Sequence, residues 1–180
     1  PVYYENKIYV GQQGGEDDFY CLDAKTGKLI WKQNVGWVWG SAEVADGLVF
    51  IPGIDGYVIC LDAGNGNMIW RFRTDRSVCS EPMVMGSYVY FGSWDGFLYK
   101  FEKKTGKLVA KFPGGGSDSG VTVGFDGKII LPVGGMKCVD AESGEMIWEP
   151  KLSNADGGTN STPAYHNGQV FTSVSRGGGA

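Results

Sequence analysis

The stretch CLDAKTGKLIW, residues 21–31, occurs in four versions along the chain. The other three are CLDAGNGNMIW at residues 60–70, KFEKKTGKLVA at residues 100–110 and CVDAESGEMIW at residues 138–148. The phrase therefore returns every 38 to 40 residues. A period of this length is typical of radial β architectures, in which each repeat forms one four-stranded blade. The spacing predicts an all-β chain folded as a β-propeller.

The second repeat shows how one blade is divided into strands. The pairs Asp46-Gly47, Asp55-Gly56 and Asn65-Gly66 favour tight hairpin turns. They separate four expected strands at residues 42–45, 48–52, 57–62 and 68–72. Strands joined by short hairpins are antiparallel neighbours, so we expect each blade to be a meander. No apolar period of 3.6 residues predicts a helix.

Divided in the same way, the chain forms a single propeller segment. Its repeats lie at approximately residues 1–40, 41–79, 80–118 and 119–160, and a half repeat follows at residues 161–180. The first strand of the fourth repeat is expected at residues 120–123. Four and a half blades do not close a ring of the usual size, and an open ring exposes sheet edges and an apolar flank. We expect a larger ring whose missing blades come from the same or another chain.

Composition narrows the classes of partner. With 16 Lys and Arg against 20 Asp and Glu, the net charge is −4, which argues against nucleic acid and anionic membranes as partners. No apolar run of 18 residues predicts a direct membrane span. The chain starts at Pro1 with no charged and apolar leader, so a targeting segment would lie outside the given sequence.

The repeated phrase has a clear structural interpretation. Its acidic residue can accept turn N–H groups, and its glycine permits a positive φ; these glycines are Gly27, Gly66, Gly106 and Gly144. The tryptophans fall on the outermost strand, where a large ring can cover the strand edge; they are Trp31, Trp70 and Trp148. The cysteines at the start of the phrase, Cys21, Cys60 and Cys138, are expected to be buried thiols too far apart for disulfides.

The phrase Leu-Asp-Ala-x-x-Gly-x-x-x-Trp resembles the tryptophan-docking repeat of the quinoprotein-type β-propellers. Further matches are Ser80-Glu81-Pro82 at a first strand and residues 92–99 across two strands. This superfamily includes dehydrogenases dependent on pyrroloquinoline quinone (PQQ) and BamB-like propellers without catalytic activity. The resemblance implies a partial ring of the eight-bladed type and a periplasmic or extracellular location. It also implies that the phrase's alanines, Ala24, Ala63 and Ala141, belong to the docking structure between blades.

The third repeat departs from the family pattern. Lys103 replaces the alanine and Ala110 replaces the tryptophan. We therefore expect the docking contact to be absent on that blade, with Phe112 covering part of the gap.

The residues predict no catalytic, cofactor-binding or metal site. The PQQ dehydrogenases carry adjacent cysteines, calcium ligands and a catalytic Asp, but this chain has no Cys-Cys pair and no segment that matches those ligands. The acidic run Glu16-Asp17-Asp18 lacks the spacing of a calcium loop and indicates a solvated turn. The only histidine, His166, is expected in an exposed turn.

Strand direction assigns the connections to two ends of the propeller. The connections from second to third strand and from blade to blade emerge at one end, called the loop face. This end receives the parts that differ between repeats, including residues 12–18 and 154–160. It also receives a candidate interaction face of aromatic and basic residues, namely Trp37, Trp39, Trp94, Arg71, Arg73 and Arg76. Variable loops on a rigid scaffold commonly carry recognition.

These observations leave three functions open. The first is a non-catalytic propeller scaffold that binds a protein or peptide partner through its loop face. The second is a fragment of a PQQ-dependent alcohol or sugar dehydrogenase, which would require PQQ and calcium. The third is a small-ligand sensor. The first is favoured, because a fold is poor evidence for an activity and the enzyme's hallmarks do not occur in the sequence.

Overall fold

The computed structural model describes residues 1–12, 18–115, 124–131, 136–150 and 163–171. All regular structure in these ranges is β-strand, which confirms the all-β prediction. The strands form four sheets of four strands and one of two strands, and every pairing is antiparallel between strands adjacent in sequence. The blades are therefore meanders.

Each of the first four sheets corresponds to one blade. The first blade contains β1 (Val2–Tyr4), β2 (Lys7–Gly11), β3 (Asp18–Asp23) and β4 (Leu29–Asn34). The second contains β5 (Glu43–Ala45), β6 (Leu48–Pro52), β7 (Tyr57–Asp62) and β8 (Met68–Arg73). The third contains β9 (Met83–Met85), β10 (Tyr88–Gly92), β11 (Phe97–Glu102) and β12 (Leu108–Pro113). The fourth contains β13 (Gly124–Phe125), β14 (Lys128–Leu131), β15 (Lys137–Asp140) and β16 (Met146–Trp148). A last hairpin is formed by β17 (Ala164–His166) and β18 (Gln169–Phe171).

The turn chemistry explains this division. Asp46 and Gly47 both have positive φ, 51° and 74°, which is the backbone of a type I′ hairpin turn. The expected strands of the second repeat agree with β5 to β8 to within one residue at each end. The strand expected at residues 120–123 lies outside the described residues.

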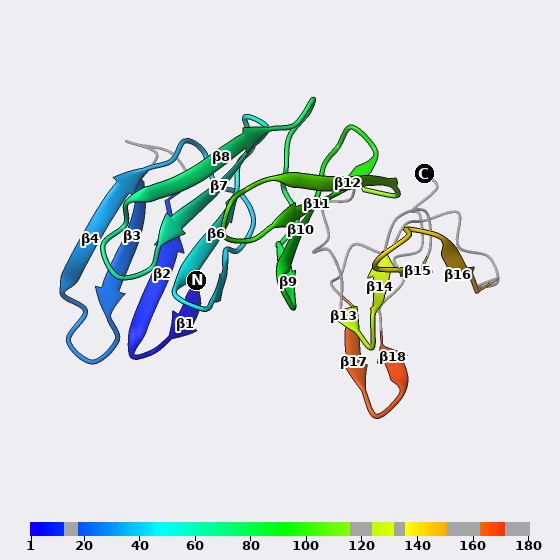
Figure 1. The fold of residues 1–180 in the computed structure, drawn as a ribbon. Coiled ribbons are helices and arrows are strands. Elements are labelled where there is room, and N and C mark those ends of the chain that lie inside the picture. Colours follow the sequence, from blue (N-terminus) through cyan, green and yellow to red (C-terminus); the bar gives the residue numbers. More distant parts are fainter. Residues whose placement is uncertain (13–17, 116–123, 132–135, 151–162, 172–180) are drawn as a thin grey trace, which may run out of the picture.

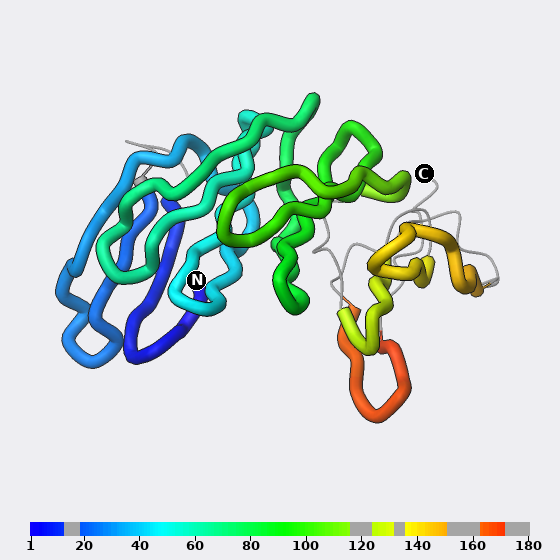
Figure 2. Tube along the Cα trace, in the orientation of Figure 1, coloured from blue at the N-terminus to red at the C-terminus, as the bar shows by residue number. Residues whose placement is uncertain are grey.

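The blades follow one another side by side in chain order (Figure 1). The first strands of neighbouring blades contact each other, which places β1, β5, β9 and β13 on the inner side and the fourth strands on the outer side. The chain trace passes through the blades in the same order (Figure 2). Buried side chains form layers between the sheets; Tyr9 and Trp31 of the first blade pack with Leu61 of the second. The contact between two successive blades is called a joint below.

The first two joints are built around a tryptophan. The indole N–H of Trp31 donates to the carbonyl oxygen of Ala63 at 3.1 Å. The indole N–H of Trp70 donates to the carbonyl oxygen of Lys103 at 2.9 Å. Both rings are buried. Each tryptophan thus satisfies a backbone acceptor in the turn of the next blade.

The prediction that the third blade lacks a docking contact is wrong for its joint with the second blade. Trp70 still docks there, because its acceptor is the backbone carbonyl of Lys103 and any residue supplies a carbonyl. The Lys103 side chain instead binds the Asp46 carboxylate and the Gly86 carbonyl. The substitution of alanine by lysine therefore leaves the second joint intact.

The third joint has no tryptophan, because residue 110 is alanine. The carbonyl of Ala141 accepts hydrogen bonds from the Tyr90 hydroxyl at 3.2 Å and from the Lys100 ammonium group at 3.0 Å. Lys100 is 1% exposed and lies opposite Ala110 in the β11–β12 pair. Its charge is paired with Glu142 at 2.6 Å. A lysine and a tyrosine thus occupy the donor role that tryptophan has in the second joint.

A ring packs against the turn glycine in all three joints. A Cβ atom would lie 2.6 Å from Trp31 if added at Gly66. It would lie 2.0 Å from Phe112 if added at Gly144. Phe112 is buried and so fills the ring position in the joint that lacks tryptophan. The close approach of ring and backbone requires glycine at this place.

Candidate recognition surface

The backbone holds the connections of the loop face together across the joints. The N–H of Ile54 donates to the carbonyl of Trp37 at 2.9 Å, and the N–H of Trp94 donates to the carbonyl of Ser77 at 2.9 Å. Each bond joins the connection that leaves one blade to the second turn of the next blade. Trp37 lies in the connection between two blades and Trp94 in the second turn of a blade, and equivalent bonds hold both segments at the same end of successive joints.

The three predicted tryptophans of the loop face are exposed. Trp37, Trp39 and Trp94 are exposed by 46, 57 and 47%, respectively, although their backbones lie in ordered connections. Val38, between the first two, is buried and anchors the connection. The rings of Trp37 and Trp39 are thus presented to solvent by a segment that is fixed at its centre.

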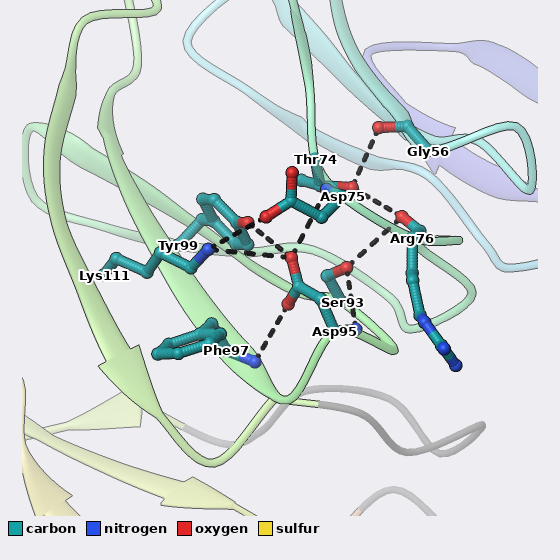
Figure 3. Close-up of polar contacts among 9 residues, drawn as sticks. All are labelled: Gly56, Thr74, Asp75, Arg76, Ser93, Asp95, Phe97, Tyr99 and Lys111. Carbon is teal, nitrogen blue, oxygen red and sulfur yellow. Dashed lines mark hydrogen bonds and ion pairs between the residues drawn. The ribbon is translucent and has the colours of Figure 1, made fainter.

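A polar cluster fixes the loop that carries Trp94 (Figure 3). The Asp95 carboxylate accepts hydrogen bonds from the Tyr99 hydroxyl and from the N–H of Phe97, the latter at 3.0 Å. It also accepts a long bond of 3.4 Å from the N–H of Asp75 in the preceding blade. The Lys111 ammonium group lies 3.4 Å from the Asp75 carboxylate and 3.8 Å from that of Asp95. The cluster therefore joins the second and third blades.

A second set of bonds in Figure 3 holds the backbone at Arg76. The Arg76 carbonyl lies 2.6 Å from the Thr74 hydroxyl and 3.2 Å from the Ser93 hydroxyl. Both hydroxyl-bearing residues are buried, whereas the Arg76 residue as a whole is exposed. Arg76 therefore projects from a rigid connection.

The cluster is not arranged for proton transfer near neutral pH. Burial, and secondly the hydrogen bond to Asp95, raises the pKa of the Tyr99 hydroxyl. The hydrogen bond to Tyr99, supported by the Asp95 charge, raises the pKa of Lys111. A neutral phenol and a charged ammonium group are both poor bases. The cluster acts as a tie between two loops.

The cysteine thiols are buried, and the described residues contain no cluster of side chains that could bind a metal. Burial raises the pKa of the Cys60 thiol to about 12 and also raises the pKa values of Cys21 and Cys138. These thiols are buried and form no disulfide. Within the described ranges, no group of three or more His, Cys, Asp and Glu side chains gathers as metal ligands would. His166 is exposed at the end of β17.

Two of the three arginines of the candidate interaction face lie beside the same aromatic ring. The guanidinium groups of Arg71 and Arg73 stand 5.3 and 5.4 Å from the centre of the Tyr57 ring. Together with Arg76 they are exposed, and none of the three forms an ion pair with an acidic side chain in the described part of the chain.

Two small cavities open at the loop face between the first and second blades. One, of about 200 Å³, is lined by Tyr9, Phe19, Trp39 and neighbouring residues. The other, of about 190 Å³, is lined by Asp55, Arg71 and neighbouring residues. Both are smaller than the roughly 300 to 1,000 Å³ of a usual ligand pocket.

Sequence reasoning missed the groups that tie the blades together. Lys100 stands at the repeat position that is cysteine in the other blades, and it lies opposite Ala110. The sequence therefore shows two substitutions of the third repeat that face each other across the sheet. No pattern in the sequence indicates the hydrogen bond from the N–H of Asp75 to the Asp95 carboxylate, because the two residues belong to different blades. Of the predicted loops, residues 13–17 and 154–160 lie outside the described residues.

Four-stranded meanders joined by docked aromatic rings define the tryptophan-docking class of β-propellers. The chain belongs to the family described as outer membrane protein assembly factor BamB, whose model matches residues 15–177. It is 24% identical over 168 residues to the BamB of Burkholderia pseudomallei, covering 88% of this chain and 43% of the relative. It is 26% identical over 105 residues to the BamB of Marinobacter adhaerens, covering 58% of this chain and 26% of the relative. The chain spans less than half the length of these relatives.

Solved structures share the fold. BamB from Moraxella catarrhalis matches with a TM-score of 0.66 and 21% identity, over 82% of this chain and 50% of that chain. The computationally designed Ika8 protein matches with a TM-score of 0.75 and 14% identity, over 96% and 54%. A europium-containing methanol dehydrogenase matches with a TM-score of 0.55 and 20% identity, over 64% and 24%. At these identities the likeness concerns the fold alone, and the dehydrogenase is not favoured as a functional guide.

Proposed function

We propose that this chain is part of a non-catalytic propeller that acts in the assembly of outer membrane proteins. In this proposal the loop face binds extended segments of a protein partner in the periplasm. Membership of the BamB family supports the process and the compartment. In the described part of the chain there is no helix long and apolar enough to cross a membrane.

The exposure of Trp37, Trp39 and Trp94 on fixed connections carries the proposal. A large ring exposed to water is unfavourable by itself, yet here three are presented at one end of a rigid scaffold. Tryptophan and arginine are the residues that most often dominate binding energies at interfaces. The loop face supplies both.

The charge at this face indicates the chemistry of the bound segment. Arg71, Arg73 and Arg76 have no acidic partner among the described residues, so carboxylates of a partner could pair with them. The cavity beside Trp39 could take an apolar or aromatic side chain. A segment that combines acidic and apolar residues fits this surface best.

Binding to a peptide array that covers outer-membrane β-barrel sequences would test the proposal. We expect the chain to select peptides with acidic and aromatic residues, and the double variant Trp37→Ala/Trp94→Ala to weaken binding at least tenfold while the protein stays folded. The matched control is Tyr3→Ala, which removes an exposed ring from β1 and should leave binding unchanged. A folded double variant that binds the same peptides equally well would refute the proposal.

A further inference from the structure

The cavity lined by Asp55 and Arg71 lies in the first joint at the place that the polar cluster of Figure 3 has in the second joint. A shift of 40 residues relates the two places, because β7 and β8 begin at residues 57 and 68 and β11 and β12 at residues 97 and 108. The N–H of Tyr57 donates to Oδ1 of Asp55 at 3.2 Å. The N–H of Phe97 donates in the same way to Oδ1 of Asp95 at 3.0 Å. Four residues that line the cavity correspond to members of the cluster: Val35, Asp55, Ile59 and Arg71 to Asp75, Asp95, Tyr99 and Lys111.

The second carboxylate oxygen has different partners in the two joints. Oδ2 of Asp95 accepts the hydrogen bond of the Tyr99 hydroxyl. Oδ2 of Asp55 has no hydrogen-bond donor within the described ranges, because the residue that corresponds to Tyr99 is Ile59. This oxygen lies beside the connection between the blades, since a Cβ atom added at Gly36 would be 3.1 Å from it. The first joint thus has the acceptor of the cluster without its hydroxyl donor.

We propose that this cavity binds a tyrosine side chain of the partner segment, whose phenol hydroxyl donates a hydrogen bond to Oδ2 of Asp55. The hydroxyl of the ligand then has the role in the first joint that the Tyr99 hydroxyl has in the second. The inference rests on the function proposed above, because the tyrosine belongs to the segment that the loop face binds.

The walls of the cavity suit an aromatic ring. Val35 and Ile59 are buried apolar residues, and Met68 and Arg71 complete the lining toward the solvent. Thioether sulfur and guanidinium groups both make favourable contacts with aromatic rings. The volume of about 190 Å³ suits a single side chain.

The charges beside the cavity favour tyrosine over other side chains. Among the described residues, Arg71 forms no ion pair with Asp55, because its guanidinium group lies over the Tyr57 ring, 5.3 Å from the ring centre. A lysine in the cavity would be repelled by Arg71, and a carboxylate would be repelled by Asp55. A phenylalanine would fill the space but would cover Oδ2 of Asp55 without giving it a donor. A neutral ring with a hydroxyl donor avoids all three costs.

Two uncharged probes that differ only in the hydroxyl test this proposal. The folded chain is titrated with N-acetyl-tyrosinamide and with N-acetyl-phenylalaninamide, and binding is followed by NMR at the backbone amides of Gly36 and Tyr57. We expect both amide signals to shift and the tyrosine probe to bind about tenfold more tightly or better, which is the usual effect of a hydrogen bond to a charged group.

Variants at the carboxylate and at the cavity wall locate the binding. Asp55→Asn keeps an oxygen for the N–H of Tyr57 but replaces Oδ2 by an amide group that donates, so we expect the preference for the tyrosine probe to be lost. Glu145→Gln is the matched control, because it removes a carboxylate from an exposed turn of another blade and should leave both affinities unchanged. Ile59→Tyr supplies the hydroxyl from the chain itself, as Tyr99 does, and should abolish binding while the protein stays folded.

The results separate this inference from the proposed function. A wild-type chain that binds neither probe, or binds both equally, would overturn the inference, and so would a folded Asp55→Asn variant that still prefers the tyrosine probe. If peptides of the array still bind through Trp37 and Trp94 in that case, the proposed function stands and the tyrosine site alone fails. If the array shows no binding but the tyrosine probe binds through Asp55, the site stands and the proposed function fails.

Discussion

The second and third joints solve the same structural problem with different side chains. In the second, one residue, Trp70, supplies both the ring over the turn glycine and the N–H that binds the turn carbonyl. In the third, these two tasks are divided: Phe112 supplies the ring, while Tyr90 and Lys100 supply the donors. The difference shows that the joint is defined by its backbone acceptor and its glycine.

The division also explains why the substitutions in the third repeat occur together. Cysteine faces tryptophan across the third and fourth strands in the other blades, as Cys60 faces Trp70. In the third blade Lys100 faces Ala110. In the third blade the long side chain with the hydrogen-bond donor is therefore on the third strand instead of the fourth, and its donor still reaches the next blade. Buried polar groups need partners, so the change from tryptophan to alanine requires another donor.

The largest effect is expected for Trp70→Ala. This change removes a buried ring that packs with Phe50 and Phe101, and it removes the donor to Lys103. We expect a loss of about 3 to 5 kcal/mol in the free energy of unfolding, measured with chemical denaturant. The exposed Trp37→Ala serves as a control. A loss below about 1 kcal/mol for Trp70→Ala would mean that the ring does not hold the joint.

Two glycine variants, with a smaller expected effect, distinguish the free-energy cost of a ring contact from the cost of backbone strain. Gly144→Ala and Gly27→Ala both place an alanine at positive φ, 74° and 69°, but only at Gly144 does a ring occupy the place of the new methyl group. We therefore expect Gly144→Ala to lose about 1 to 3 kcal/mol more than Gly27→Ala, which is the usual cost of overpacking. Thermal and urea unfolding of the two variants at low protein concentration measures this difference. Equal losses would show that Phe112 does not press on the turn.

The smallest effect concerns the inner end of the second joint. Burial, and secondly the charge of Glu81, raises the pKa of the Glu43 carboxyl above its value in the unfolded chain. The ionised form is therefore disfavoured in the folded state, which lowers stability at neutral pH and has no effect once pH falls below the unfolded pKa of about 4.3.

Glu43→Gln should accordingly raise the urea midpoint slightly at pH 7, and the gain should vanish below about pH 4. The matched control is Glu145→Gln, which changes an exposed turn residue and should have no such effect. A gain for Glu43→Gln that persists in acid would assign it to a cause other than charge.

The sequence was sufficient for the blades but not for every joint. Turn pairs such as Asp46-Gly47 encode a local conformation, so strands and meanders follow from neighbouring residues. The donor in the third joint depends on which side chains of two blades meet, and Lys100 lies 41 residues from the carbonyl it binds. Strand parity predicts that Trp37 and Trp94 lie at one end, because hairpins alternate between ends, but it does not predict that their rings are exposed, which the structure shows. Whether these rings form one binding surface is still a prediction.

A double-mutant cycle at Tyr90 and Lys100 tests most directly whether the turn carbonyl defines the joint. Tyr90→Phe and Lys100→Met each remove one donor to Ala141 and leave the other, whereas the double variant leaves a buried acceptor unpaired. In urea unfolding we predict that the double variant loses about 1 kcal/mol or more beyond the sum of the single losses. Losses that add to within about 0.5 kcal/mol would show that the two donors act independently and would contradict this account.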